Sequence, residues 1–231
     1  MTGREIIYDY GDDSGSGQKS FCTADERQLD FERVREIAFG EEWYPEHFEA
    51  ALGGDAPRKL FCRGNAALLT CPIVMVCGAR NASETALDLA YRCGCLLAES
   101  KIVTASGYAR GVDMAAHRGA LDGGGDTLAF LPYGAARFKI HRDIQGAFDP
   151  ERFLLVSETA PWQVFSSYSA LRRNKLLVAL ASSVIVIEPG ETGGTWYSAE
   201  RSSRMEKPLF FLEGRRPEII ERMESLGGVR Q

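Results

Sequence analysis

Val184-Ile-Val-Ile-Glu-Pro-Gly-Glu-Thr-Gly-Gly-Thr195 contains the pattern that most clearly indicates the fold class of this chain. Its first four residues are aliphatic and mostly β-branched, which predicts a strand buried on both faces of a sheet. Glycines, a proline and threonines follow, and residues 196–204 can then form a helix. A strand, a glycine-rich turn and a helix in this order point backbone N–H groups and the positive end of the helix at a phosphate.

The same alternation of strand and helix runs through the chain from Pro72 onward. Strands are predicted at 73–77, 102–105, 127–131, 153–156, 184–187 and 209–212, and helices at 84–98, 112–121, 171–181, 196–204 and 217–226. Such alternation predicts an α/β domain with a Rossmann-like, mostly parallel sheet and helices on both faces. In sheets of this kind, ligands bind beyond the carboxyl ends of the strands.

The size of the chain, 231 residues, fits one domain with a small addition. No apolar run approaches the roughly 20 residues that cross a bilayer, and the first residues contain no signal-type apolar segment. We therefore expect a cytoplasmic protein that does not enter the membrane. Six cysteines without a C-x-x-C pair are expected to be reduced thiols.

The distribution of charge is uneven along the chain. Residues 1–55 contain 14 acidic and 5 basic residues, a balance of −9, whereas residues 56–231 contain 18 acidic and 22 basic residues, a balance of +4. We therefore expect a basic face for polyanions on the main domain, which the net charge of −5 conceals.

The composition of the first residues predicts a separate segment. We expect residues 1–42 to be acidic and partly flexible and residues 43–231 to form the domain. A flexible arm is predicted over residues 1–22, because they are polar and rich in glycine, serine and aspartate. A short helix is predicted from Asp25 to Phe39, and a small strand over residues 60–62.

The turns after the predicted strands combine small residues with arginines. Glycine lets the backbone approach a ligand, and the planar guanidinium of arginine matches a phosphate. Glycines alone are expected in the turns of any α/β protein, but the arginines beside them are not. The candidate phosphate- or nucleic-acid-binding residues at these strand ends are Gly78, Arg80, Ser106, Gly107, Arg110, Gly193, Gly194 and Thr195.

Two basic segments add to this set. In the loop over residues 137–142, the ring of Phe138 is predicted to stack on a base of a single-stranded nucleic acid. Arg172-Arg-Asn-Lys175 is predicted to begin a helix, where three cations oppose the helix dipole, so we expect an anion beside them. The candidate residues from these two segments are Lys139, Arg142, Arg173, Asn174 and Lys175.

Other polar residues are expected to have structural roles. Asp113 and His117 are four residues apart on one predicted helix, but no third ligand has a matching spacing, so we expect a packed histidine and no metal site. The carboxylate of Glu158 is expected to accept a hydrogen bond from Arg172 or Arg173. We expect no cofactor.

These motifs occur in the order found in the DNA-processing protein A (DprA/Smf) family, which the chain resembles over about residues 43–214. The matching segments are Trp43-Tyr-Pro45, Leu60-Phe-Cys-Arg-Gly-Asn65, Cys77-Gly-Ala-Arg80, Ala105-Ser-Gly-Tyr-Ala-Arg-Gly-Val-Asp113, Ala116-His-Arg-Gly-Ala-Leu121, Ser157-Glu158, Arg173-Asn-Lys175 and Gly193-Gly-Thr195. The resemblance implies a Rossmann-like domain that binds single-stranded DNA, forms a homodimer and helps load the recombinase RecA during natural transformation and recombination. It implies no enzymatic activity.

The sequence departs from the family pattern at several positions. Lys175 stands where the family has the last arginine of R-N-R, and Gly193-Gly-Thr195 replaces the usual S-G-S or S-G-T. Phe138-Lys139 stands in the region where the family has Y-P. We also expect the family's N-terminal helical domain to be at most a remnant here, and its C-terminal winged helix to be absent.

Two other functions remain open from the residues. Nucleotide phosphoribohydrolases of a related fold carry a similar P-G-G-x-G-T turn, followed two or three residues later by a carboxylate. This chain has Tyr197 and Ser198 at those positions, and its first acid is Glu200, so N-glycosidic hydrolysis would lack its acid–base group. The third possibility is a sensor domain that holds a nucleotide ligand.

Overall fold

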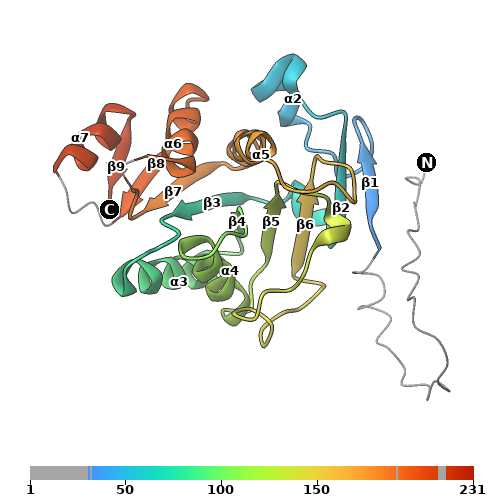
Figure 1. Cartoon of the computed structure of the whole chain (residues 1–231), viewed down its shortest axis with the longest axis horizontal. Coiled ribbons are helices and arrows are strands. Elements are labelled where there is room, and N and C mark those ends of the chain that lie inside the picture. Colours follow the sequence, from blue (N-terminus) through green and yellow to red (C-terminus); the bar gives the residue numbers. More distant parts are fainter. Residues whose placement is uncertain (1–30, 32, 191, 213–216) are drawn as a thin grey trace.

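The computed structural model describes residues 31, 33–190, 192–212 and 217–231. In this part of the chain a nine-stranded sheet lies between two layers of helices (Figure 1). The predicted flexible arm over residues 1–22 lies outside the described residues.

The strands follow the spatial order β1-β2-β6-β5-β4-β3-β7-β8-β9. All pairings from β6 to β9 are parallel, and only β1–β2 and β2–β6 are antiparallel, which confirms the predicted mostly parallel sheet. The strands are β1 (Arg35–Ala38), β2 (Lys59–Gly64), β3 (Ile73–Gly78), β4 (Val103–Ser106), β5 (Thr127–Leu131), β6 (Phe153–Ser157), β7 (Ser183–Ile187), β8 (Leu209–Leu212) and β9 (Gly228–Arg230).

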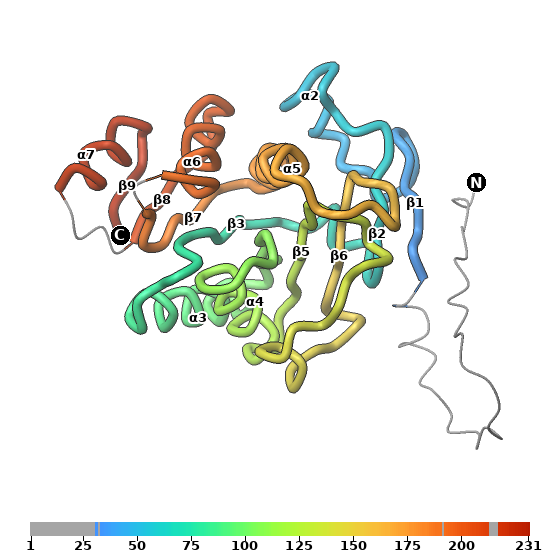
Figure 2. Tube along the Cα trace, viewed as in Figure 1, coloured from blue at the N-terminus to red at the C-terminus, as the bar shows by residue number. Residues whose placement is uncertain are grey.

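Helices cover both faces of the sheet, as predicted. Figure 2 shows α3 and α4 on one face and α5 and α6 on the other. The helices are α2 (His47–Leu52), α3 (Glu84–Glu99), α4 (Val112–Asp122), α5 (Ser167–Leu180), α6 (Gly194–Arg204) and α7 (Pro217–Ser225), with short 3₁₀ turns at Gly53–Asp55, Ala66–Thr70 and Ala135–Arg137. Alanines and glycines of α3 and α4 let these two helices pack closely: a Cβ on Gly119 would lie 1.9 Å from the carbonyl oxygen of Tyr91.

The centre of the sheet is where the chain changes direction. From β3 the strands run outward through β4 and β5, whereas β7 lies on the opposite side of β3. The turn after β3 therefore leads to α3 on one face, and the turn after β7 leads to α6 on the other face (Figure 1). Such a switch point opens a crevice beyond the strand ends.

Two predicted helices differ from the structure. The helix predicted from Asp25 to Phe39 is wrong for its last residues, because Arg35–Ala38 is an edge strand in which Ile37 is buried and pairs with Leu60. The sheet thus extends beyond residue 43 toward the amino terminus. Residues 25–30 and 32 of that helix lie outside the described residues.

The helix predicted to begin at Leu171 in fact begins at Ser167. Ser166 caps it, since its hydroxyl accepts the N–H of Ser169 and the Ser169 hydroxyl accepts the N–H of Ser166. Ser169 stands at the third helical position, where a capping box usually has a glutamate. The start of this helix is therefore hard to recognise from the sequence. Strand β9 was not predicted, because three residues carry too little pattern.

No helix in the described part of the chain combines the length and the apolar character that crossing a bilayer requires.

Candidate functional site

A cavity of about 620 Å³, here called the strand-end cavity, lies at the carboxyl ends of β3, β4 and β7. It is lined by the turns after these strands and by one side of α5, so four separate segments converge on it. The predicted residues that line it are Gly78, Arg80, Gly107, Arg110, Arg173, Asn174, Gly193, Gly194 and Thr195. Its position is the one that a switch point predicts.

The wall between β3 and β7 requires close approach of two backbones. A Cβ on Gly78 would lie 2.0 Å from the carbonyl oxygen of Ile187, so only glycine fits there. The hydroxyl of Thr195 donates to the carbonyl oxygen of Gly78 at 3.2 Å and ties the start of α6 to the end of β3. These contacts hold the turn before α6 against the end of β3, and the other side of this turn lines the cavity.

The amino end of α6 has no capping side chain. Its cap residue is Gly193, with φ 112°, which has no side-chain oxygen to accept the first N–H groups of the helix. Asn174 on α5 donates to the carbonyl oxygen of Gly194 at 3.2 Å and positions this turn from the side. Uncapped N–H groups and the positive end of the helix dipole therefore contribute to the cavity wall, an arrangement that favours anions.

Arg80 and Arg110 are the unpaired cations of the cavity. Both are exposed, and within the described ranges neither makes a hydrogen bond or an ion pair. They follow β3 and β4, which are neighbouring strands. Two free guanidinium groups at one cavity are suited to bind phosphate oxygens.

Arg173 also lines the cavity, but its role differs from the predicted one. Its side chain is buried, and Nη1 donates to the carbonyl oxygens of Gly107 and Phe130, the latter at 2.6 Å. Its Nε is buried without a partner among the described residues. Burial lowers the pKa of Arg173, while the carboxylate of Asp113 acts in the opposite direction.

Asp113 completes a clamp on the turn after β4. Its Oδ2 accepts the N–H groups of Gly107 at 3.1 Å and Ala109 at 3.3 Å. Burial raises the pKa of Asp113, whereas the Arg173 guanidinium and the two backbone donors lower it. Arg173 and Asp113 therefore fix this turn from its carbonyl and its N–H side, and Arg110 extends from the turn they hold.

Lys175 and Arg172 lie outside the strand-end cavity and are paired. The expectation that cations begin this helix is wrong, because α5 begins at Ser167 and the cluster lies beyond its first turn. Lys175 forms an ion pair with Asp55. Arg172 donates to both carboxylate oxygens of Glu158, at 2.9 and 2.7 Å, which confirms the predicted role of Glu158.

Three further predicted residues do not join the cavity. Ser106 is fully buried, and its hydroxyl donates to the carbonyl oxygen of Val76 at 2.5 Å. Lys139 and Arg142 are exposed in their loop, with Arg142 3.5 Å from Asp143. The prediction that Phe138 stacks on a base is wrong, because its ring is buried against Phe31 and Phe153.

His117 is a packed core residue, as predicted. Its Nδ1 lies 2.7 Å from the hydroxyl of Thr127, which itself donates to the carbonyl oxygen of Thr104. The Thr127 hydroxyl is thus the acceptor for Nδ1–H. Burial lowers the pKa of His117 to about 3, so the ring is neutral. No group of three or more His, Cys, Asp or Glu side chains suited to a metal occurs among the described residues.

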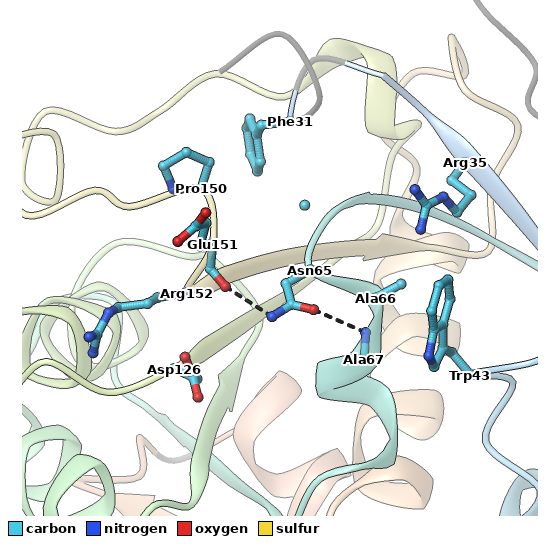
Figure 3. A pocket seen from close by; sticks show the side chains of 11 residues that line it. Phe31, Arg35, Trp43, Asn65, Ala66, Ala67, Asp126, Pro150, Glu151 and Arg152 are labelled. Atoms are coloured by element: carbon cyan, nitrogen blue, oxygen red, sulfur yellow. Dashed lines mark hydrogen bonds between the residues drawn. The ribbon is translucent and has the colours of Figure 1, made fainter. Parts of the chain in front are cut away.

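A larger cavity of about 840 Å³ lies at the other end of the strands, beside the amino ends of β5 and β6 (Figure 3). The Arg35 guanidinium lies 5.3 Å from the centre of the Trp43 ring on one side. On the other side, the Asn65 amide donates to the carbonyl oxygen of Glu151 at 3.0 Å. None of the predicted residues lines this cavity, so size alone does not identify the candidate site.

An exposed apolar segment before and within the start of α5 was missed from the sequence. Five of the eight large exposed apolar side chains in the described part of the chain lie within residues 162–171. They are Trp162, Val164, Phe165, Tyr168 and Leu171. A sequence pattern does not distinguish an apolar residue at a helix start from a core residue, so only the structure reveals their exposure.

The family model described as DNA recombination-mediator protein A matches residues 35–228. The chain belongs to this family. A curated relative, the DNA processing protein DprA of Streptococcus pneumoniae, is 29% identical over 187 residues, which cover 80% of this chain and 65% of the relative. The chain spans between 37% and 65% of the length of the curated relatives it matches.

Two solved structures of family members have the same fold. DNA processing protein A from Helicobacter pylori, whose structure concerns its single-stranded DNA binding mode, is 28% identical with a TM-score of 0.72, covering 84% of this chain and 90% of that chain. DprA from Streptococcus pneumoniae is 26% identical with a TM-score of 0.75, covering 90% of this chain and 75% of that chain. Both confirm the Rossmann-like architecture.

Proposed function

We propose that this protein binds single-stranded DNA through the strand-end cavity and acts in DNA uptake and recombination. The observation that carries the proposal is the convergence of Arg80, Arg110 and the uncapped amino end of α6 on one cavity. Both arginines lack partners among the described residues, so their charge is available to a phosphate. The single-stranded DNA binding of the related protein from Helicobacter pylori supports the same class of ligand.

The cavity is suited to a flexible single strand more than to a duplex. It is a hollow at strand ends, and it is lined by turns and by the side of α5. A hollow of this kind admits one phosphate with its sugar or base, whereas groove recognition of duplex DNA uses a protruding helix or ribbon. We therefore expect single-stranded oligonucleotides to bind more tightly than duplexes of the same length.

A binding series against salt concentration tests the proposal. Each phosphate contact on a single strand contributes roughly −0.7 to the slope of log affinity against log salt concentration. With two free arginines at the cavity, the expected slope is about −1.4 or steeper. A slope near zero, or equal affinity for duplex and single strand, would refute the proposal.

The family's homodimer and its recombinase partner belong to the same proposal. Light scattering of the protein alone, and with a single-stranded oligonucleotide, measures whether it is a dimer. Loading of a RecA-type recombinase is measured as faster filament formation on DNA coated with single-strand-binding protein. A monomer at all concentrations, together with unchanged filament formation, would contradict this part alone.

We propose no enzymatic activity for the cavity. Glu200, the first acid after the α6 turn, does not line it and lies 3.3 Å from Arg222. The described carboxylate that does line it, Asp113, accepts two backbone N–H groups and thereby holds the turn after β4. Incubation with nucleoside monophosphates should release no free base, and measurable release would favour the hydrolase. Binding of a dinucleotide but not of single-stranded DNA would instead favour a nucleotide sensor.

A further inference from the structure

The exposed segment over residues 162–171 gathers three aromatic rings on the surface. Its rings are Trp162, Phe165 and Tyr168, with exposed fractions of 47%, 56% and 79%, and we call these three residues the aromatic shelf. Monomeric proteins rarely expose apolar side chains in such a concentration unless the surface binds something. The shelf is therefore a candidate binding surface.

The backbone under the shelf is firmly held. Gly134 donates to the carbonyl oxygen of Gln163 at 2.9 Å, and Ala136 donates to that of Pro161 at 3.0 Å. A capping box at Ser166 and Ser169 fixes the start of α5, two residues before and one residue after Tyr168. The rings thus extend from an ordered turn and a helix, which reduces the entropy lost when they bind.

One ring of the shelf, Tyr168, lines a cavity that shares one residue with the strand-end cavity. A neighbouring cavity of about 490 Å³ is lined by Tyr168, Gln163 and Arg173, and Arg173 also lines the strand-end cavity. Tyr168 is exposed in the first turn of α5, five residues before the buried Arg173.

The charged side chains that line this neighbouring cavity are paired, whereas the exposed Arg137 donates to the carbonyl oxygen of Trp162 at 3.4 Å. Arg172 and Glu158 line the same neighbouring cavity, and they form a two-pronged ion pair with each other. Asp55, also in its lining, is paired with Lys175. Exposed rings beside paired charges are suited to the faces of bases, which stack on aromatic rings whatever their sequence.

We propose that the aromatic shelf stacks the unpaired bases that follow the nucleotide held in the strand-end cavity. This inference rests on the proposed function and adds a second kind of contact to it. Phosphate contacts at Arg80 and Arg110 set the salt dependence, whereas the shelf contributes affinity that salt does not screen. The shelf would also exclude duplex DNA, whose bases are stacked on each other.

The test compares the variant Phe165→Ala/Tyr168→Ala with Leu96→Ala, an equally exposed apolar residue on α3. We expect single-stranded DNA to bind the double variant at least tenfold more weakly, with the wild-type salt slope, and Leu96→Ala to behave like wild type. Replacing the bases of the oligonucleotide by abasic sites should weaken wild-type binding by a similar factor and leave the double variant nearly unaffected.

Several results would overturn the inference. Equal affinity of the double variant and Leu96→Ala, or insensitivity of the wild type to abasic sites, would show that bases do not stack on the shelf. If light scattering shows that the double variant loses a dimer and its affinity falls only for that reason, the shelf is an interface between copies. If the wild type binds no single-stranded DNA at all, the proposed function itself fails, whereas a normal salt slope without ring dependence refutes the shelf alone.

Discussion

Two groups of cations differ in whether their charge is free: one pair lines the strand-end cavity, and the other group is clustered on α5. Arg80 and Arg110 are isolated in the sequence, follow neighbouring strands and remain unpaired within the described residues. Arg172, Arg173 and Lys175 are clustered in the sequence, yet each is occupied by a carboxylate or by backbone carbonyls. The density of positive charge along a sequence therefore does not locate the charge that is available to a ligand.

The difference has a physical cause. A cation that replaces its water with protein acceptors loses the capacity to bind a further anion without breaking those bonds. Arg173 is the extreme case, because its buried guanidinium joins the turn after β4 to the end of β5. Substitution of Arg172, Arg173 or Lys175 should therefore change the stability of the fold. Substitution of Arg80 or Arg110 should instead change the affinity for DNA.

The largest expected effect is on stability, for Arg173→Ala. The substitution leaves the carbonyl oxygens of Gly107 and Phe130 without their donor and removes the buried charge opposite Asp113. We expect a loss of roughly 3–5 kcal/mol in the free energy of unfolding, measured by denaturant titration. Arg80→Ala, on an exposed residue without partners, should stay within about 0.5 kcal/mol of the wild type. A mild effect of Arg173→Ala would mean that this arginine is not a structural clamp.

The buried His117 should make the free energy of unfolding depend on pH. Folded His117 has a pKa of about 3, lowered first by burial and then by Arg173, whereas the unfolded residue titrates near 6.5. Between these values the unfolded chain binds more protons, so stability is full above pH 6.5 and falls as the pH decreases toward 3. The expected slope is roughly 1.4 kcal/mol per pH unit from this residue.

His117→Asn isolates this contribution, because its amide nitrogen can replace the Nδ1 donor to Thr127 without titrating. Denaturant titrations at a series of pH values should give a shallower decline for the variant than for the wild type between pH 6 and pH 4. Parallel pH profiles of the two proteins would contradict the assignment of a neutral, buried histidine.

The free cations depend on close backbone packing, and Gly78→Ala tests this dependence. The added Cβ would lie 2.0 Å from the carbonyl oxygen of Ile187, so β3 and β7 must separate. We expect a destabilisation of roughly 1–3 kcal/mol and weaker DNA binding. Gly146→Ala, where nothing lies within 4 Å of the added Cβ, is the matched control. Wild-type stability of Gly78→Ala would show that the strand ends are not tightly joined there.

Much of this fold follows from the sequence, because strands and helices alternate with a clear period. The strand predicted over 127–131 has the observed bounds, and the buried run at Val184 is β7. The helix predicted to start at Asp25 failed where Arg35–Ala38 pairs with β2, since an edge strand of four residues is determined by its partner. The composition of a short segment does not determine which strand it pairs with in the sheet.

The site was predicted less completely than the fold. The wrong predictions share one cause, which is that the sequence does not show the tertiary contacts of a side chain. The sequence identifies which turns follow which strands, so the convergence of the turns at Gly78, Gly107 and Gly193 was foreseeable. It does not reveal which polar group is already satisfied: Ser106 bonds to Val76, and Lys175 pairs with Asp55, a residue 120 positions away. Nor does it reveal which aromatic ring is exposed, as the buried Phe138 and the exposed Phe165 demonstrate.

The most direct test of the difference between the two groups of cations is the salt dependence of single-stranded DNA binding by two double variants. Arg80→Ala/Arg110→Ala should bind weakly and lose about 1.4 from the slope of log affinity against log salt concentration, because it lacks two phosphate contacts. Arg172→Ala/Lys175→Ala removes equal charge and should keep nearly the wild-type slope. If the second variant loses slope and the first does not, the packed cluster binds the DNA and the free arginines do not.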